Sequence, residues 1–356
     1  MKNLASVRQK ETPAIDKARE DCIFCGLCTK NCRFLSEYEI MIGDLDELDA
    51  HKWSCYLCGR CSEVCPVNID GMQVVWDMRS YESSRKSVAK TVSRGGAYCW
   101  EKMRYPFRNY RHAAKRSFFP GCSFLSNFPE TTRAVYGLLA ETIGAGIVYD
   151  CCGSPIYELG LGDTTASIVS RLSKRLSAHG VEEIFTACPH CYELLNGNLP
   201  QKVRTVYEVL PDDVIVTSAE SRDDKDCGAS GDTGKPLEDG DGRHTLRLYP
   251  PCPDRRMGYK MLRTLEPHID GKPEIWDRSQ CCGFGGNAAK EEHRISVGLA
   301  KDIGDERLCT YCASCANALG TFAGTTGRHI LSLLLGIDET ADTRHSFINR
   351  AKSTFV

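Results

Sequence analysis

The sequence lacks four features that would indicate familiar protein classes. The longest apolar run near its end, Ile330 to Leu335, is far shorter than the roughly 20 residues that span a bilayer. No apolar segment follows Met1 and Lys2, so we expect no signal peptide. The formal net charge of -2 argues against a general nucleic-acid-binding protein. No G-x-G-x-x-G opens a helix after a strand, so a flavin or nicotinamide fingerprint is missing. These absences predict a cytoplasmic protein, soluble or peripheral to a membrane.

Cysteine is abundant instead, with 21 in 356 residues. An odd number in a chain expected in the cytoplasm argues against a disulfide framework and favours metal binding. A zinc-binding interaction protein is the competing hypothesis, and it predicts Cys-x-x-Cys pairs separated by a spacer. The two hypotheses differ in the spacing of the cysteines that they require.

Two four-cysteine runs with bacterial ferredoxin spacing lie near the N-terminus, Cys22-x2-Cys25-x2-Cys28-x3-Cys32 and Cys55-x2-Cys58-x2-Cys61-x3-Cys65. In this pattern three cysteines bind one cubane cluster and the fourth binds the other. The predicted ligands of the first 4Fe-4S cluster are Cys22, Cys25, Cys28 and Cys65. Those of the second are Cys55, Cys58, Cys61 and Cys32. A zinc site does not explain four cysteines in a row, twice.

A five-cysteine pattern also occurs twice: a lone cysteine, an adjacent pair after 28 residues, and then Cys-x-x-Cys. Adjacent cysteines close a disulfide with each other only under strain, whereas their thiolates suit neighbouring irons of one cluster. The first set is Cys122, Cys151, Cys152, Cys188 and Cys191. The second is Cys252, Cys281, Cys282, Cys312 and Cys315. Cys99, Cys227 and Cys309 are left over. Cys309-x2-Cys312 is a competing pair, but aligning Thr310 to Cys315 with Thr186 to Cys191 favours Cys312 and Cys315.

These motifs resemble the cysteine-rich CCG family over residues Asp21 to Ile337. The family includes the catalytic subunit of heterodisulfide reductase, one of the subunits of anaerobic glycerol-3-phosphate dehydrogenase, and iron-sulfur proteins of lactate and glycolate oxidation. The segment between the two ferredoxin runs resembles the helical ferredoxin domain of succinate dehydrogenase and heterodisulfide reductase subunits. The resemblance implies a noncubane 4Fe-4S cluster on each five-cysteine set. It also implies disulfide cleavage between the two sets, with the pairs Cys151, Cys152 and Cys281, Cys282 as catalytic residues.

We therefore predict an α+β chain with an all-α ferredoxin-like domain, holding two 4Fe-4S clusters, followed by two duplicated α/β CCG domains. The boundaries are 1–84 for the ferredoxin domain, 85–116 for a basic linker, 117–218 for the first CCG domain, 219–243 for an acidic loop and 244–340 for the second CCG domain. Expected helices are 71–89, 130–143, 163–179 with Asp163 as N-cap, 255–265 and 287–303. Expected strands are 116–120, 146–150, 181–187 and 244–249. Strand ends would gather the cysteines at one edge of each sheet.

Two functions fit these expectations. One is a heterodisulfide reductase-like oxidoreductase subunit that carries electrons through two cubane clusters to a disulfide-like substrate. The other is an electron-transfer subunit that links a flavin dehydrogenase, of glycerol-3-phosphate, lactate or glycolate type, to quinone or another carrier. Because iron-sulfur clusters move single electrons, both functions need a partner, either a flavoprotein dehydrogenase or a quinone-linked membrane subunit.

The basic, aromatic stretch from Arg85 to Arg116 is either the docking face for that partner or a solvated linker. His190, Arg255 and Arg256 lie beside cluster cysteines in the sequence. They either meet an anionic substrate or have ordinary helix-start and surface roles.

Overall fold

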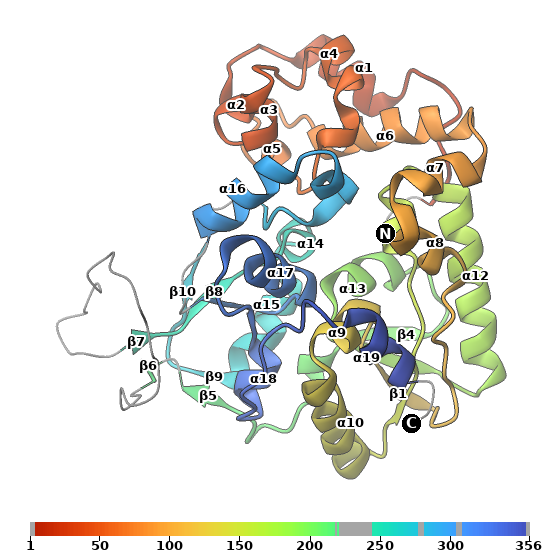
Figure 1. The fold of residues 1–356 in the computed structure, drawn as a ribbon, viewed down its shortest axis with the longest axis vertical. Helices are drawn as coiled ribbons and strands as arrows, with labels where there is room; N and C mark the ends of the chain where they lie inside the picture. Colours follow the sequence, from red (N-terminus) through yellow and green to blue (C-terminus); the bar gives the residue numbers. More distant parts are fainter. Residues whose placement is uncertain (1–3, 218, 221–243, 277–280, 304–307, 354–356) are drawn as a thin grey trace.

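The computed structural model describes residues 4–217, 219–220, 244–276, 281–303 and 308–353 (Figure 1). Cys227 and most of the expected acidic loop lie outside the described residues. Within the described part, no helix combines the length and the apolarity needed to cross a membrane.

The N-terminal region is helical and occupies the top of the view in Figure 1. Its helices are α1 (Pro13–Asp21), α2 (Leu27–Lys30), α3 (Arg33–Glu37), α4 (Leu45–Ala50), α5 (Arg60–Glu63) and α6 (Gly71–Ser84). The turns before α2 and α5 have the same backbone: Phe24 and Leu57 have φ of 51° and 52°, and Gly26 and Gly59 have 74° and 81°. The repeated cysteine spacing therefore corresponds to a repeated loop geometry.

The expected helix over 71–89 is wrong at its end, because α6 stops at Ser84 and Arg85 caps it. The Ser87 side chain then accepts the Lys90 N–H and starts α7 (Val88–Arg94), which α8 (Gly96–Arg104) follows. Val92 and Cys99 are buried against Ile156 and Leu159. Val92 in α7 and Cys99 in α8 thus pack onto the following α/β unit.

The first α/β unit contains a parallel sheet in the order β2 (Gly146–Ile147), β1 (Arg116–Phe119), β3 (Glu183–Thr186), β4 (Lys202–Thr205). Its long helices are α10 (Pro129–Ile143) and α12 (Gly162–Ala178), and α9 (Cys122–Asn127) and α13 (Pro189–Leu195) begin beside cysteines. The expected N-cap role of Asp163 is wrong. Leu161 is the N-cap, and the Asp163 carboxylate accepts the Ser6 N–H and pairs with Arg8.

The second unit repeats this topology with a parallel sheet in the order β10 (Glu274–Ile275), β8 (Arg247–Tyr249), β11 (Leu308–Thr310), β12 (Arg328–His329). The registers match as well, since Phe118 faces Phe185 in the first sheet and Leu248 faces Cys309 in the second. Cys309 therefore occupies the strand position of Phe185, in agreement with the alignment that leaves it out of the cysteine set.

The expected helices of the second unit are wrong in detail. The helix over 255–265 is two helices, α14 (Cys252–Arg256) and α15 (Lys260–Leu265), because Gly258 and Tyr259 have positive φ of 65° and 61°. The helix over 287–303 starts only at α16 (His293–Ile303), after the turn η4 (Gly285–Lys290). Gly286 in that turn has φ of 65°, and a Cβ there would meet the Cys55 carbonyl at 2.4 Å. The close approach of η4 to the N-terminal region thus favours glycine at this position. The expected strand over 244–249 is likewise divided into β7 (His244–Thr245) and β8.

Candidate functional site

The first pocket of the N-terminal region is lined by the four cysteines predicted for the first cubane, Cys22, Cys25, Cys28 and Cys65. Cys61 also lines it, together with apolar residues such as Ile42 and Ile69. Cys65 belongs to the second run in the sequence, so the fold brings it across to the first. Cys25 is exposed to solvent at this pocket.

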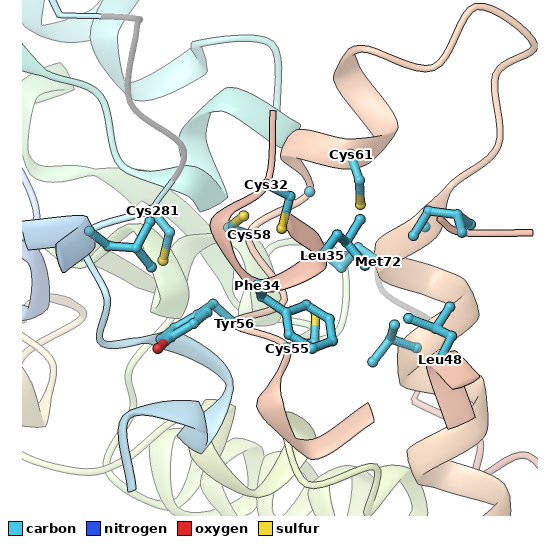
Figure 2. Close-up of a pocket in the computed structure, with 15 residues that line it drawn as sticks. Cys32, Phe34, Leu35, Leu48, Cys55, Tyr56, Cys58, Cys61, Met72 and Cys281 are labelled. Carbon is cyan, nitrogen blue, oxygen red and sulfur yellow. The ribbon is translucent and has the colours of Figure 1, made fainter. Parts of the chain in front are cut away.

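The second pocket holds the other four, Cys32, Cys55, Cys58 and Cys61 (Figure 2). Its remaining lining is largely apolar, with Phe34, Leu35 and Leu48 among the residues drawn. Burial raises the pKa of the Cys55 thiol to about 11 and also raises that of Cys61. Thiolates in such a pocket need a cation to compensate their charge, and iron supplies one.

A buried arginine beside this pocket is consistent with an anionic group in it. Arg79 is fully buried and donates hydrogen bonds to the carbonyls of Lys52, Cys55, Glu158 and Gly286, at 2.6–3.0 Å. All its hydrogen-bond acceptors in the described residues are neutral carbonyls. Burial lowers the pKa of Arg79 to about 10, so the guanidinium stays charged at neutral pH. An iron-sulfur cluster on four thiolates carries the negative charge that such a buried cation favours.

The two five-cysteine sets meet at a cavity of about 250 Å³. From the first set it is lined by Cys122, Cys152, Cys188 and Cys191, and from the second by Cys252, Cys282 and Cys315. The sulfurs of Cys122 and Cys151 are 3.8 Å apart, and those of Cys152 and Cys191 are 3.3 Å apart. The ten cysteines are all buried. The sulfurs approach in pairs, and no three metal-binding side chains of the described residues lie close enough to hold one metal ion.

The second cysteine of each adjacent pair has a lowered pKa. The thiols of Cys151 and Cys191 lower the pKa of Cys152 to about 6, and those of Cys281 and Cys315 lower the pKa of Cys282 to about 6. Cys191 and Cys315 have their pKa raised by the same contacts and by burial. In the second set, contact with Cys315 lowers the pKa of Cys312 as well. Because burial and neighbouring thiols raise the pKa of other cysteines in both sets, full deprotonation needs bound metal.

The three cysteine sites are neighbours. Cys61 lines both N-terminal pockets, and Cys281 lines the second of them. The Cys58 thiol is in hydrogen-bonding contact with Cys281, whose neighbour Cys282 faces the 250 Å³ cavity. The sites thus form a continuous series from Cys25 at the surface to the cavity.

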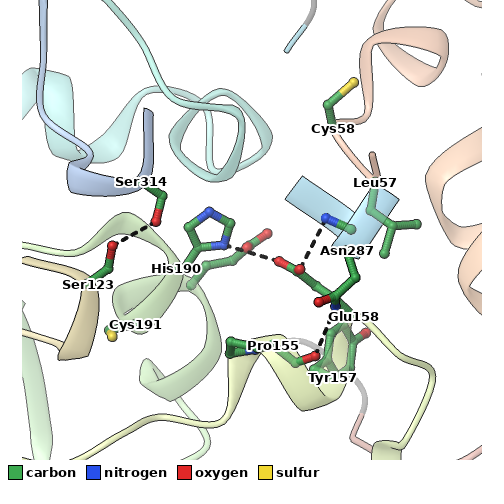
Figure 3. A network of polar contacts seen from close by, with 12 residues as sticks. Leu57, Cys58, Ser123, Pro155, Tyr157, Glu158, His190, Cys191, Asn287 and Ser314 are labelled. Carbon is green, nitrogen blue, oxygen red and sulfur yellow. Dashed lines mark hydrogen bonds and ion pairs between the residues drawn. The ribbon is translucent and has the colours of Figure 1, made fainter. Parts of the chain in front are cut away.

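Polar groups face one another in the cavity (Figure 3). His190 Nδ1 lies 3.7 Å from the Glu158 carboxylate, which also accepts the Gly286 N–H at 3.1 Å. The hydroxyls of Ser123 and Ser314, one from each unit, are 3.0 Å apart. Sequence reasoning missed Glu158, since nothing in its spacing from Cys152 marks it.

The two arginines that the sequence placed beside cluster cysteines have structural contacts and do not line this cavity. Arg255 is buried and pairs with Glu63 at 3.2 Å, and Arg256 makes two 2.8 Å bonds to the Glu193 carboxylate. Arg256 also donates to the Leu57 carbonyl, so it joins the second unit to the N-terminal loop and to the first unit. Surface roles for these residues are therefore wrong.

Comparison with known proteins gives a family match and several curated relatives. Residues 117–196 match the cysteine-rich domain family CCG. The chain is 24% identical to a subunit of the fumarate reductase (CoM/CoB) of Methanothermobacter marburgensis, over 80% of this chain and 63% of the relative. It is 23% identical to an uncharacterized iron-sulfur protein of Methanococcus maripaludis, over 72% of this chain and 54% of the relative.

A protein of Archaeoglobus profundus that is similar to a heterodisulfide reductase subunit is 26% identical, over 28% of this chain and 59% of the relative. The chain therefore matches between half and two thirds of the length of these relatives. The five-cysteine repeat, the paired sheets and these matches lead to one conclusion: the chain contains a CCG cysteine-rich domain at residues 117–196 and is related to proteins described as subunits of heterodisulfide reductase and of the CoM/CoB fumarate reductase.

Proposed function

We propose that the chain is the iron-sulfur subunit of a heterodisulfide reductase-like oxidoreductase and reduces a disulfide-like substrate in the cavity between its two five-cysteine sets. The observation that carries the proposal is that both sets line one cavity together with polar side chains, among them Glu158 and His190. Clusters bound to both sets would take up part of this cavity, so the polar side chains beside them, which a simple electron relay does not need, are what favour a bound substrate.

The residues divide into four cofactor sites. The two pockets of the N-terminal region fit two cubane clusters, each with three cysteines of one run and the last cysteine of the other. The two five-cysteine sets fit two further 4Fe-4S clusters of the noncubane kind that the family resemblance implies. Bound there, the clusters would supply electrons one at a time.

Reduction in the cavity would take its two electrons from the redox partner through the clusters, one proton from a group of this chain and the other from solvent. A disulfide takes two electrons and two protons, its S–S bond breaks, and two thiols leave. His190, held beside Glu158, is the protein group facing the cavity that we assign to deliver a proton to a leaving thiolate. The hydroxyls of Ser123 and Ser314 would position the substrate between the two units.

A panel of disulfides, with reduced methyl viologen as electron donor, tests the proposal. We expect thiol formation from at least one disulfide and a loss of about tenfold or more for His190→Gln. His345→Gln is the control, because this exposed histidine pairs with Asp342 and does not line the cavity. Transfer of electrons to a quinone analogue, without thiol formation from any disulfide, would instead favour the electron-transfer subunit of a flavin dehydrogenase.

Each ferredoxin run gives its fourth cysteine to the cluster of the other run, and this assignment can be tested separately. In Cys65→Ser, the EPR signal of the cluster on Cys22, Cys25 and Cys28 should change, and the signal of the other cubane should stay. The reason is that Cys65 lines the first pocket with Cys22, Cys25 and Cys28 and does not line the second pocket. Cys32→Ser should give the opposite result. The assignment of Cys65 to the first cluster would be contradicted if Cys65→Ser lost the cluster on Cys55, Cys58 and Cys61.

A further inference from the structure

An exposed apolar patch surrounds Cys25, the one cysteine of the described residues that is exposed. Ile23, Phe24 and Leu27 are 62%, 53% and 39% exposed, and all three line the first pocket together with Cys25. Three large apolar side chains this close together in the chain are costly in water. The patch therefore indicates a surface that is covered part of the time.

The region that carries this patch is acidic in sequence. Residues 21–70 contain nine acidic residues against four basic ones, an excess of five negative charges before any cluster is added. Asp21, next to the patch in the sequence, is exposed and pairs with Lys17, and Glu20 is exposed too. The acidic excess of this region disfavours an anionic membrane surface and favours a protein with a basic rim.

The part of the basic stretch that carries Arg104, Arg108 and Arg111 lies elsewhere, although the earlier Arg94 contacts Trp53 of the N-terminal region. Arg104, Arg108 and Arg111 are exposed, but Phe107 packs on Phe347 with ring centroids 5.0 Å apart, and Asn109 bonds to Ser353. These contacts place the stretch beside the C-terminal helix α19 (Ser346–Lys352), in the lower half of Figure 1, whereas α2 lies at the top. Other basic residues of the stretch are already paired, such as Arg94 with Glu291 and Lys115 with Glu182.

We infer that the patch of Ile23, Phe24 and Leu27 over Cys25 is the docking surface for a redox protein whose own docking face has an apolar centre and a basic rim. The inference rests on the proposed function, because it takes Cys25 as a ligand of the first cubane. A small patch suits a transient encounter, since weak redox complexes bury little surface. One electron crosses per encounter, from the reduced cluster to the oxidised cofactor of the partner or in reverse.

Mitochondrial cytochrome c, a basic haem protein, serves as the probe in stopped-flow experiments. The dithionite-reduced protein transfers one electron to the ferric haem, which becomes ferrous. The variant Ile23→Thr with Phe24→Asn should lower the second-order rate about tenfold, and salt should lower the wild-type rate. Asn suits the Phe24 position because its φ of 51° lies in the left-handed region. Ile215→Thr, at a side chain that is 49% exposed elsewhere, should leave the rate unchanged.

The other outcomes are distinct. A variant with unchanged iron content and an unchanged rate would overturn the docking surface and leave the proposed function intact. A protein without clusters would overturn both. If the wild type, but not the variant, bound vesicles of phosphatidylcholine and phosphatidylglycerol, the patch would be a membrane-binding surface. That result would contradict a protein partner. Reduced flavodoxin is an acidic electron donor. If its electron transfer depended on Arg104, Arg108 and Arg111 and not on the patch, the docking face would be the basic stretch.

Discussion

Replacing Arg79 by methionine should destabilise the protein by about 4 kcal/mol and lower its Tm by roughly 10 °C. The substitution leaves four buried carbonyl acceptors without their donor, and they belong to three parts of the fold. Lys52 and Cys55 are in the N-terminal region, Glu158 is in the first α/β unit, and Gly286 is in the second. Thermal unfolding under anaerobic conditions measures the effect.

A control for Arg79→Met lies beside it. Arg94 covers the same Trp53 ring, at 4.4 Å from the ring centroid, but its side chain is 38% exposed and its ion pairs are long. Arg94→Met should therefore cost less than about 1 kcal/mol. We also expect the reduction potential of the cubane at Cys55 to fall in Arg79→Lys if that variant folds, because a lysine satisfies fewer carbonyls and holds its charge less firmly near the cluster. Equal stability of Arg79→Met and Arg94→Met would contradict this role.

Replacing Cys281 and Cys282 by alanine should remove about four iron atoms and reduce disulfide turnover by roughly 1,000-fold or more, to the background rate. The variant removes two neighbouring thiols of the second set, including the one whose pKa is lowered to about 6. Iron analysis and the viologen assay measure the two effects. Both cubane EPR signals should remain, although Cys281 lies against Cys58.

The control for that double variant is Cys309→Ala. Cys309 is buried in the same unit, three residues before Cys312, but it lies in β11 and belongs to the hydrophobic core. Its replacement should leave iron content and turnover unchanged. Loss of a cluster in Cys309→Ala would mean that the ligands of the second set are shifted by three residues.

Much of this arrangement follows from local spacing. The ferredoxin runs place their cysteines in tight turns, and the repeated order of lone cysteine, pair and Cys-x-x-Cys corresponds to two sheets with the same strand order. The alignment of Thr310 to Cys315 with Thr186 to Cys191 matches Cys309 with Phe185, and the two residues take equivalent positions in their sheets.

The parts that sequence reasoning missed depend on contacts between distant segments. Arg79 and Glu158 lie 79 residues apart and bond through a backbone carbonyl, which no side-chain pattern encodes. The helix breaks have the same origin: Gly286 and Asn287 take left-handed conformations where η4 packs against the N-terminal loop at Cys55. Composition alone leaves open whether the basic stretch is a docking face or a solvated linker, because it does not show which of its charges pair within the fold.

Iron analysis of the anaerobically purified protein, combined with Mössbauer spectroscopy, tests the central claim most directly. The account predicts about 16 iron atoms per chain, four for each of four clusters, with two cubane and two noncubane spectral components. About eight iron atoms with cubane signals alone would contradict the assignment of clusters to the two five-cysteine sets. Tightly bound zinc with little iron would contradict the whole account.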